Sequence, residues 1–226
     1  LAHMLEVLSW GDTGMYLITP GGGLGAAAVQ SAGNPEQKKK FLARFMDEKP
    51  TFAAMCMTEA DAGSDTSKIR ANAVLDDETN EWVLNGEKIF VTAGDKALTD
   101  YEEAGQGFIV VWATIDPEAG RAGMRSFVVE AGTPGAKVTK MEHKLGIRAS
   151  DTVTIVLQDV RVPFENILGK PTVEKNDQRF QRRDGDLRCH SSACCRDGNR
   201  RSSRRLRIRP RETRRRRCRN SLRETA

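Results

Sequence analysis

Residues 82–92 read WVLNGEKIFVT, and this stretch is the strongest local indication of how the chain folds. Apolar and β-branched residues dominate both sides of its centre, as is typical of β-strands. The central Asn85-Gly86 is the dipeptide that two-residue hairpin turns favour most, because both turn positions need positive φ. The stretch therefore predicts a hairpin whose arms are residues 82–84 and 88–92.

Similar short segments follow one another along the chain from residue 51. The other strand candidates are 51–58, 70–75, 108–115, 126–130, 136–140 and 152–162. A polar turn at 76–80 precedes the hairpin, and Pro163 ends the last candidate because proline cannot donate to a strand ladder. Seven or so short strands with turns between them predict a small antiparallel barrel or sandwich.

Residues 1–50 have helical periodicity. One apolar face at helix spacing consists of Leu1, Met4, Leu5 and Leu8. Asn34 followed by Pro35 is typical of an N-cap and a first helical residue. The helix that begins there is expected to turn Phe41, Leu42 and Phe45 inward. The expected core also includes the three tryptophans, Trp10, Trp82 and Trp112.

These patterns predict an α+β protein. We expect a partial N-terminal helical domain over 1–50 and a β-domain, a small antiparallel barrel or sandwich, over 51–170. Residues 171–181 would begin a further C-terminal domain, and residues 182–226 would form a separate tail. The chain lacks an initial methionine, which suggests that it starts inside a longer protein.

The chain changes character after Gln181. Residues 182–226 hold 17 arginines, 5 acidic residues and no lysine, a formal charge of +12, whereas residues 1–181 hold 19 basic and 26 acidic residues, a formal charge of −7. The tail has one isoleucine and three leucines but no valine, phenylalanine, methionine, tryptophan or tyrosine. It cannot bury enough apolar surface to offset chain entropy, so we expect it to be disordered.

The cysteines divide at the same place. Cys56 is the single cysteine before Gln181, and the other four lie in the tail. One cysteine in so long a segment fits a reducing compartment, and we expect a cytoplasmic protein. No run of about 18 apolar residues is present, so no membrane span is expected. His3 and His143 have no companion ligands nearby, so no metal site is expected.

A loop of small residues follows the first strand candidate. Residues 55–65 read MCMTEADAGSD, with hydroxyls at Thr58 and Ser64. Small residues let backbone N–H groups approach a ligand closely, and unpaired amides in a turn can hold an anion. Taken alone, the stretch is equally an ordinary strand exit, and residues 145–152, LGIRASDT, are equally a surface turn.

The order and spacing of these stretches resemble the acyl-CoA dehydrogenase family. The family pattern T-E-x-x-x-G-S-D matches residues 58–65, and N-G-x-K-x-x-I/V-T matches 85–92. L-G-x-R-x-S-D-T matches 145–152, and V-x-V-P-x-x-N-I/V-L-G matches 160–169. The resemblance covers essentially all of residues 1–181 and agrees with the strand-rich middle domain of that family.

The resemblance implies an FAD site on the β-domain. The residues that would line the cofactor are Met55, Cys56, Met57, Thr58, Gly63, Ser64, Phe90, Val91 and Thr92. Thr58 and Thr92 would donate hydrogen bonds near the pyrimidine edge and N5, where donors stabilise the charge of the reduced ring. Ser64 matches a position that touches both FAD and acyl-CoA. Phe90 replaces the tryptophan common in the family but can still stack, and Met55 stands where several members have an aromatic residue.

The reaction implied by the resemblance is α,β-dehydrogenation of an acyl-CoA thioester to the trans-2-enoyl-CoA. Electrons would pass to an electron-transferring flavoprotein, and the parent enzyme would be a homo-oligomer that uses neither nucleic acid nor membrane. In the family a glutamate of the C-terminal helical bundle removes the α-proton. No residue of this chain matches that glutamate, so we predict no catalytic residue in it and expect an inactive fragment.

A shifted reading frame accounts for the tail. Codons for residues 184–200 can be chosen so that reading from the second base encodes MATFDATRPPVAAMAIG, which resembles a Phe-Asp-x-Thr-Arg-Pro segment of the family. The same offset over residues 214–226 encodes AGAGVEIRYGKP. We therefore hypothesise one inserted base near the codons of Gln181 and Arg182. A clean nucleotide read with one intact frame would contradict this.

Two other classes of function remain open at this point. The arginine-rich tail could make the chain a nucleic-acid-binding protein, with an affinity that falls steeply as salt rises. The β-domain could also serve as a binding module without catalysis.

Overall fold

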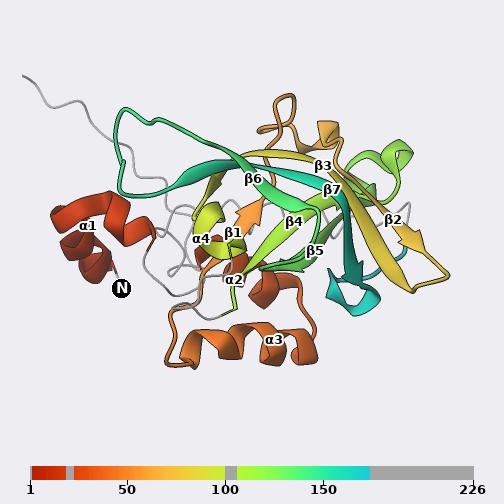
Figure 1. Ribbon diagram of the computed structural model, residues 1–226, viewed down its shortest axis with the longest axis horizontal. Helices are drawn as coiled ribbons and strands as arrows, with labels where there is room; N and C mark the ends of the chain where they lie inside the picture. The colour runs from red at the N-terminus through yellow and green to blue at the C-terminus, as the bar shows by residue number, and fades with distance from the viewer. Residues whose placement is uncertain (1, 19–22, 100–105, 174–226) are drawn as a thin grey trace, which may run out of the picture. The chain divides into compact units, whose positions relative to one another are not determined.

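The computed structural model describes residues 2–18, 23–99 and 106–173 (Figure 1). Its helices are α1 (Ala2–Leu17), α2 (Gly23–Ala32), α3 (Pro35–Leu42) and α4 (Gly94–Leu98). Its strands are β1 (Ala53–Cys56), β2 (Asn72–Asp76), β3 (Glu81–Thr92), β4 (Phe108–Thr114), β5 (Met124–Glu130), β6 (Ala136–Met141), β7 (Thr152–Pro163) and β8 (Ile167–Leu168). Short 3-10 turns are η1 (Ala43–Met46), η2 (Thr66–Lys68), η3 (Pro117–Gly123) and η4 (Phe164–Asn166). The predictions for the tail 182–226, and for most of 171–181, lie outside the described residues.

The strands form one sheet in the order β6-β7-β3-β2-β4-β5-β8, with β1 added beside β4. Most neighbours are antiparallel, so the predicted α+β class with a strand-rich domain is confirmed. The β2–β4 pairing, at Asn72 and Thr114, is parallel instead, and so is the β1–β4 pair, with Ala53 opposite Phe108. Parallel neighbours need a long connection, and between β1 and β4 it contains β2 and β3. Local sequence signals do not report such a pairing.

The hairpin predicted at Asn85-Gly86 is wrong. Strand β3 runs on through both residues and pairs with β7 on either side of them. Gly86 lies where the β3–β7 register shifts, its φ is 150°, and a Cβ there would lie 2.6 Å from the Cβ of Ala71. The glycine permits both a β-bulge and the close approach of Ala71. Glycine is favoured at such positions as it is in tight turns. The hairpin turn is the polar segment 76–80, between β2 and β3.

Strand β4 is buried on both faces because two apolar cores flank it. Ile109 and Val111 belong to the larger core inside the sheet, together with Trp82 and Phe127. The intervening Phe108 and Val110 belong to a smaller core with residues of α2 and α3, whose main members are Val29 and Phe41. Alternate side chains of a strand point to opposite faces, so one strand serves both cores. Helices α2 and α3 thus cover the β1–β4–β5 side of the sheet (Figure 1).

Helix α3 begins at the predicted cap. The Asn34 Oδ1 atom accepts a hydrogen bond from Gln37 N, and Gln37 Oε1 accepts one from Asn34 N, both at 2.8 Å. This reciprocal capping box satisfies two amides that the first turn would otherwise leave unpaired. The Gln37 Nε2 atom also donates to the carbonyls of Glu165 and Ile167, at 2.6 and 2.7 Å, which ties the helix to the start of β8.

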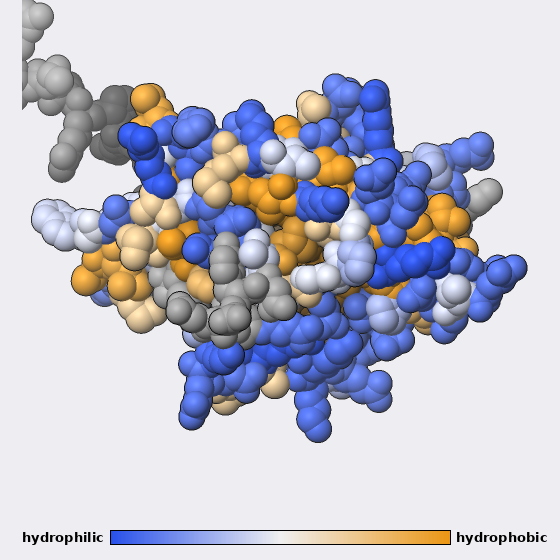
Figure 2. Space-filling model, viewed as in Figure 1, coloured by the Kyte–Doolittle hydropathy of each residue, from blue (hydrophilic) through white to orange (hydrophobic). Residues whose placement is uncertain are grey.

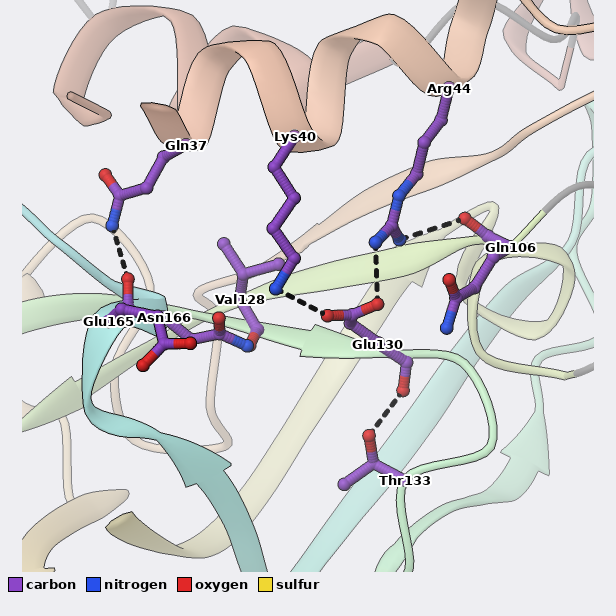
Figure 3. A network of polar contacts seen from close by, with 9 residues as sticks. All are labelled: Gln37, Lys40, Arg44, Gln106, Val128, Glu130, Thr133, Glu165 and Asn166. Carbon is purple, nitrogen blue, oxygen red and sulfur yellow. Dashed lines mark hydrogen bonds and ion pairs between the residues drawn. The ribbon is translucent and has the colours of Figure 1, made fainter. Parts of the chain in front are cut away.

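A second polar contact fastens the same helical segment to β5. Figure 3 shows Lys40 and Arg44 reaching Glu130 from one side of the helix. The two cations lie 3.2 and 2.7 Å from the two oxygens of that carboxylate. Burial opposes ionisation of Glu130, but the ion pairs outweigh it and hold the pKa of Glu130 below its usual range.

Helix α1 exposes much of the apolar face that the sequence predicts. Met4 and Leu8 are about half exposed, and Trp10 is 93% exposed. Trp82 and Trp112 are buried as expected, so the expectation of three core tryptophans is wrong for Trp10 alone. Figure 2 shows apolar residues gathered at the surface over α1. Within the described ranges, no helix is long and apolar enough to cross a membrane.

Candidate functional site

The structure brings together the two segments that the sequence predicts as cofactor-lining. Strand β1 ends at Cys56, so Met57 and Thr58 leave the sheet at that point. The Ile89 amide of β3 donates a hydrogen bond of 2.9 Å to the Thr58 carbonyl. This bond holds the exit of β1 against the last residues of β3, so Thr58 lies beside the segment that leads to Thr92.

A buried ion pair adjoins this contact. The Lys88 Nζ atom lies 2.6 Å from Glu59 Oε1 and 3.3 Å from the Met57 carbonyl oxygen. The Glu59 carboxylate also accepts the backbone amides of Arg70 and Ala71, at 2.7 and 3.0 Å. Burial lowers the pKa of Lys88, and the Glu59 carboxylate opposes that shift. Both charges are therefore held inside the domain by each other and by nearby backbone groups.

Sequence reasoning missed this pair as a contact, although both residues belong to the recognised motifs. Glu59 is the second residue of the first motif and Lys88 the fourth of the second. Two charged residues of opposite sign at fixed places in two neighbouring motifs could have suggested an ion pair. Their burial could not have been inferred, because it depends on how β1 and β3 lie in the sheet.

Phe90 occupies a strained backbone position. Its φ is 58°, a left-handed value that costs a non-glycine residue about 1–3 kcal/mol unless its surroundings impose it. The β3–β7 ladder is irregular between Lys88 and Val91, which permits this conformation. The Phe90 residue is 60% exposed. An exposed aromatic residue with a strained backbone, next in sequence to the Ile89 amide that bonds Thr58, is more typical of a ligand contact than of core packing.

Two threonine hydroxyls in these segments make no hydrogen bond within the described part of the chain. Thr58 and Thr92 are both half-buried, and among the described residues neither hydroxyl has a hydrogen-bond partner. A hydroxyl offers one donor and two acceptor positions, and a half-buried one gains from finding a partner. These side chains can therefore serve a ligand without disturbing the domain.

The remaining predicted residues fall into two groups. Cys56 and Val91 are fully buried in the larger core, so they can reach a ligand only through their backbones. Burial raises the pKa of Cys56 to about 12, with Lys88 acting in the opposite sense, so its thiol is protonated and unreactive at neutral pH. Met55 and Met57 are partly buried against the same core.

Gly63 and Ser64 lie farther along, in an exposed loop. The loop begins after a single bridge between Glu59 and Ala62. Asp65 follows, accepts hydrogen bonds from the Ser67 amide and hydroxyl, and lies 3.6 Å from Arg121 of η3. The loop is thus anchored on both sides while Gly63 and Ser64 stay open to solvent.

The third motif also reaches the end of β3. The Asp151 Oδ2 atom accepts the Asp95 amide at 2.9 Å, and the Ala93 amide donates to the Asp151 carbonyl at 3.3 Å. The other oxygen, Oδ1, is buried with no hydrogen-bond partner among the described residues. Burial, with the nearby Asp95 charge, raises the pKa of Asp151. Arg148 of the same motif is exposed and forms no ion pair with Asp151.

The comparisons with known proteins point to one family. Residues 54–160 match the family model described as acyl-CoA dehydrogenase, middle domain. Acryloyl-CoA reductase (NADH) of Anaerotignum propionicum is 39% identical over 156 residues, which are 69% of this chain and 36% of that protein. A probable medium-chain specific acyl-CoA dehydrogenase 2, mitochondrial, of Caenorhabditis briggsae is 40% identical over 172 residues, 74% of this chain and 39% of that one.

Solved structures give the same result. Butyryl-CoA dehydrogenase of Megasphaera elsdenii is similar with a TM-score of 0.58 and 34% identity, over 72% of this chain and 39% of that chain. An acyl-CoA dehydrogenase of Bacillus anthracis, described as complexed with FAD, has a TM-score of 0.54 and 36% identity, over 66% of this chain and 23% of that chain. The fold and motifs are those of the acyl-CoA dehydrogenase middle domain.

Residues 54–160 of the chain are a middle domain of the acyl-CoA dehydrogenase family, which confirms the resemblance carried by the motifs. The chain spans less than half the length of these curated relatives. Within the described residues no cluster of three metal-ligating side chains is present.

Proposed function

We propose that this domain binds FAD where Thr58 meets the end of β3. The observation that carries the proposal is the combination of an exposed, strained Phe90 with the half-buried hydroxyls of Thr58 and Thr92, which have no hydrogen-bond partner among residues 2–18, 23–99 and 106–173. A relative of the same fold, from Bacillus anthracis, is described as complexed with FAD. The residues present therefore fit the cofactor that the family implies.

Each residue of the site would make a distinct contribution. The Phe90 ring offers a flat apolar surface, and Met55 and Met57 offer partly buried apolar side chains nearby. The hydroxyls of Thr58 and Thr92 can donate hydrogen bonds that stabilise negative charge on a ring. When bound, the flavin supplies the hydride-accepting chemistry of the reaction. The protein's part is to bind it and to set the polarity at its edge.

The proposed substrate class is an acyl-CoA thioester. Three curated relatives are named for such compounds: acryloyl-CoA, medium-chain acyl-CoA and cyclohex-1-ene-1-carbonyl-CoA. The proposed reaction of the whole enzyme is α,β-dehydrogenation of the thioester. The exposed Ser64 is proposed to contact both the cofactor and the thioester. An electron-transferring flavoprotein is the proposed electron acceptor, as the family resemblance implies. Such a flavoprotein of Acidaminococcus fermentans is named in the description of a similar solved structure, with a TM-score of 0.56.

For the chain itself we propose flavin binding without turnover. The two most buried carboxylates near the site are already committed to the fold. Glu59 holds Lys88 and two backbone amides, and Asp151 holds the Asp95 amide. Neither is placed to remove a proton from a substrate, so the domain would supply the cofactor surface and not the base.

Titration of FAD with the full chain tests this proposal. We expect binding that quenches flavin fluorescence, and no flavin bleaching when butyryl-CoA is added without oxygen. Thr58→Val and Thr92→Val each remove one hydrogen bond of about 1 kcal/mol and should lower FAD affinity about fivefold. Thr139→Val, on the exposed strand β6, is the matched control and should have no effect. Bleaching by butyryl-CoA would refute the proposed lack of turnover.

The same assay separates the other two classes of function. A chain cut after Gln181 should keep its FAD affinity and lose any retention on DNA, because the arginines lie beyond that point. If the full chain is stable and soluble but binds no FAD, the flavin proposal fails and a binding module without a cofactor becomes the better interpretation.

A further inference from the structure

We infer that Lys88, through its buried ion pair with Glu59, is a positioning residue that fixes Thr58 relative to Phe90 and Thr92 for flavin binding. The inference rests on the proposed function and adds a role that touches neither cofactor nor substrate. Its basis is a set of contacts between two short segments: 57–59, which contains Thr58, and 88–89, which directly precedes Phe90 in the sequence.

Three consecutive residues are each tied to the same place on β3. The Met57 carbonyl faces Lys88 Nζ at 3.3 Å, and the Glu59 carboxylate faces the same nitrogen at 2.6 Å. Between them, the Thr58 carbonyl accepts the Ile89 amide at 2.9 Å. The peptide groups on both sides of Thr58 are therefore held, and Phe90 follows directly on the strand that holds them.

The far side of Glu59 is held as well. Its two oxygens accept the backbone amides of Arg70 and Ala71, just before β2. A carboxylate that accepts from three directions cannot rotate without breaking a buried hydrogen bond, which is costly. Glu59 is thus held rigidly, and its ion pair with Lys88 keeps the neighbouring Thr58 against β3.

Stability alone does not explain a charged pair at this position. The Lys88 side chain is completely buried, and its charge lies close enough to Cys56 of the larger core to interact with it. Burying two charges is expensive, and replacing such a pair by apolar residues of similar volume is often neutral or stabilising. An ion pair adds a defined geometry, because its hydrogen bonds specify where each partner lies. The contact between Thr58 and the end of β3 requires such a defined geometry.

The test compares the double variant Glu59→Gln/Lys88→Met with Val129→Ala in the full chain. The double variant removes both charges together, so no lone charge is left buried. Val129 is fully buried on β5, which pairs with β4 and β8 and not with β1 or β3, so its truncation weakens the same larger core without altering β1, β3 or the Glu59–Lys88 pair. FAD affinity and hydrogen exchange of the Ile89 amide without FAD are measured for both, under conditions where both are folded.

We expect the double variant to lose at least tenfold in FAD affinity and at least tenfold in protection of the Ile89 amide. Val129→Ala should change neither beyond its effect on global stability. If the double variant does not fold, Glu59→Asp keeps the charge but shortens its reach, and it should shift both measurements in the same direction. An Ile89 amide as protected as in the unaltered chain, or unchanged FAD affinity in a folded variant, would overturn the inference. Failure of the unaltered chain to bind FAD would refute the proposed function, and the exchange result alone would then decide whether the pair fixes Thr58.

Discussion

Lys88 and Glu59, separated by 29 residues in the sequence, meet at 2.6 Å inside the domain. The contact joins the exit of β1 to the middle of β3, and both residues belong to motifs of the family. The contribution of this contact to the free energy of unfolding can be measured separately from its effect on ligand binding.

The first prediction concerns that energy. Lys88→Met alone leaves the Glu59 carboxylate buried without its cation, and breaking a buried pair in this way costs about 3–5 kcal/mol. Glu59→Gln/Lys88→Met should cost clearly less, since no uncompensated charge remains. Urea unfolding of the unaltered chain, both single variants and the double variant gives the coupling free energy. If the losses of unfolding free energy in the two single variants add up to the loss in the double variant, the two side chains do not act as a pair.

A second prediction follows from the left-handed backbone at Ala93. Its φ is 58°, and it directly precedes the short helix α4. Glycine adopts this conformation without strain, so Ala93→Gly should stabilise the domain by about 0.5–1 kcal/mol. The matched control is Ala27→Gly within α2, where the same chemical change should destabilise by about 1 kcal/mol. Thermal unfolding of the two variants should therefore shift in opposite directions, and a loss of stability in both would contradict the strain argument.

A third prediction concerns the close approach of α2 to β1. A Cβ on Gly25 would lie 2.7 Å from the carbonyl carbon of Ala53 and 2.8 Å from its Cβ. Gly25→Ala removes backbone freedom and should stabilise an exposed helix, but here it must push α2 off the strand, at a cost of about 1–3 kcal/mol. Gly11→Ala in α1 has open space around its Cβ and serves as the control. Equal melting temperatures for the two variants would show that α2 can move without penalty.

The sequence predicts those parts of the fold that depend on neighbours along the chain. The cap at Asn34 is visible because its partner Gln37 lies three residues away. The bulge at Gly86 is misread as a turn because both need a residue tolerant of unusual φ, and only the pairing with β7 distinguishes them. The Glu59–Lys88 contact depends on strand order, which no local signal specifies. The site residues were located by motif spacing, and only the structure shows that Cys56 is sealed in the core.

The fourth prediction uses the raised pKa of Asp151. Because burial raises its pKa in the folded state above the unfolded value, the folded state holds the proton more tightly. The resulting penalty is absent at low pH and fully present above the folded pKa. Asp151→Asn keeps an oxygen for the Asp95 amide and removes the charge, so it should stabilise the domain at neutral pH. The gain should shrink as the pH falls toward about 4, where the unfolded carboxyl also takes up its proton.

Asp76→Asn provides a control of opposite sign for that experiment. The hydrogen bond from Arg161 lowers the pKa of Asp76, so its contribution to stability is present above the unfolded pKa and is lost as the pH falls through the folded pKa. This variant should be less stable than the unaltered chain at neutral pH and approach it in acid. Urea unfolding across the pH range gives the difference in unfolding free energy between each variant and the unaltered chain, and the two differences should have opposite signs. A difference for Asp151→Asn that does not change with pH would contradict the conclusion that ionised Asp151 destabilises the folded state.

The fifth prediction concerns Cys56, whose buried thiol has a pKa raised to about 12. Alkylation requires a thiolate that the reagent can reach. In the folded domain the Cys56 thiol is protonated and buried, so neither condition is met. Under native conditions at about pH 8, iodoacetamide should leave Cys56 unmodified for as long as the domain stays folded. In denaturant it should react as fast as the four cysteines after Gln181, which serve as internal references in the same sample. Peptide mapping by mass spectrometry reads both states. Rapid native labelling of Cys56 would mean that the exit of β1 opens easily, and it would weaken the case that Thr58 is held rigidly beside Phe90.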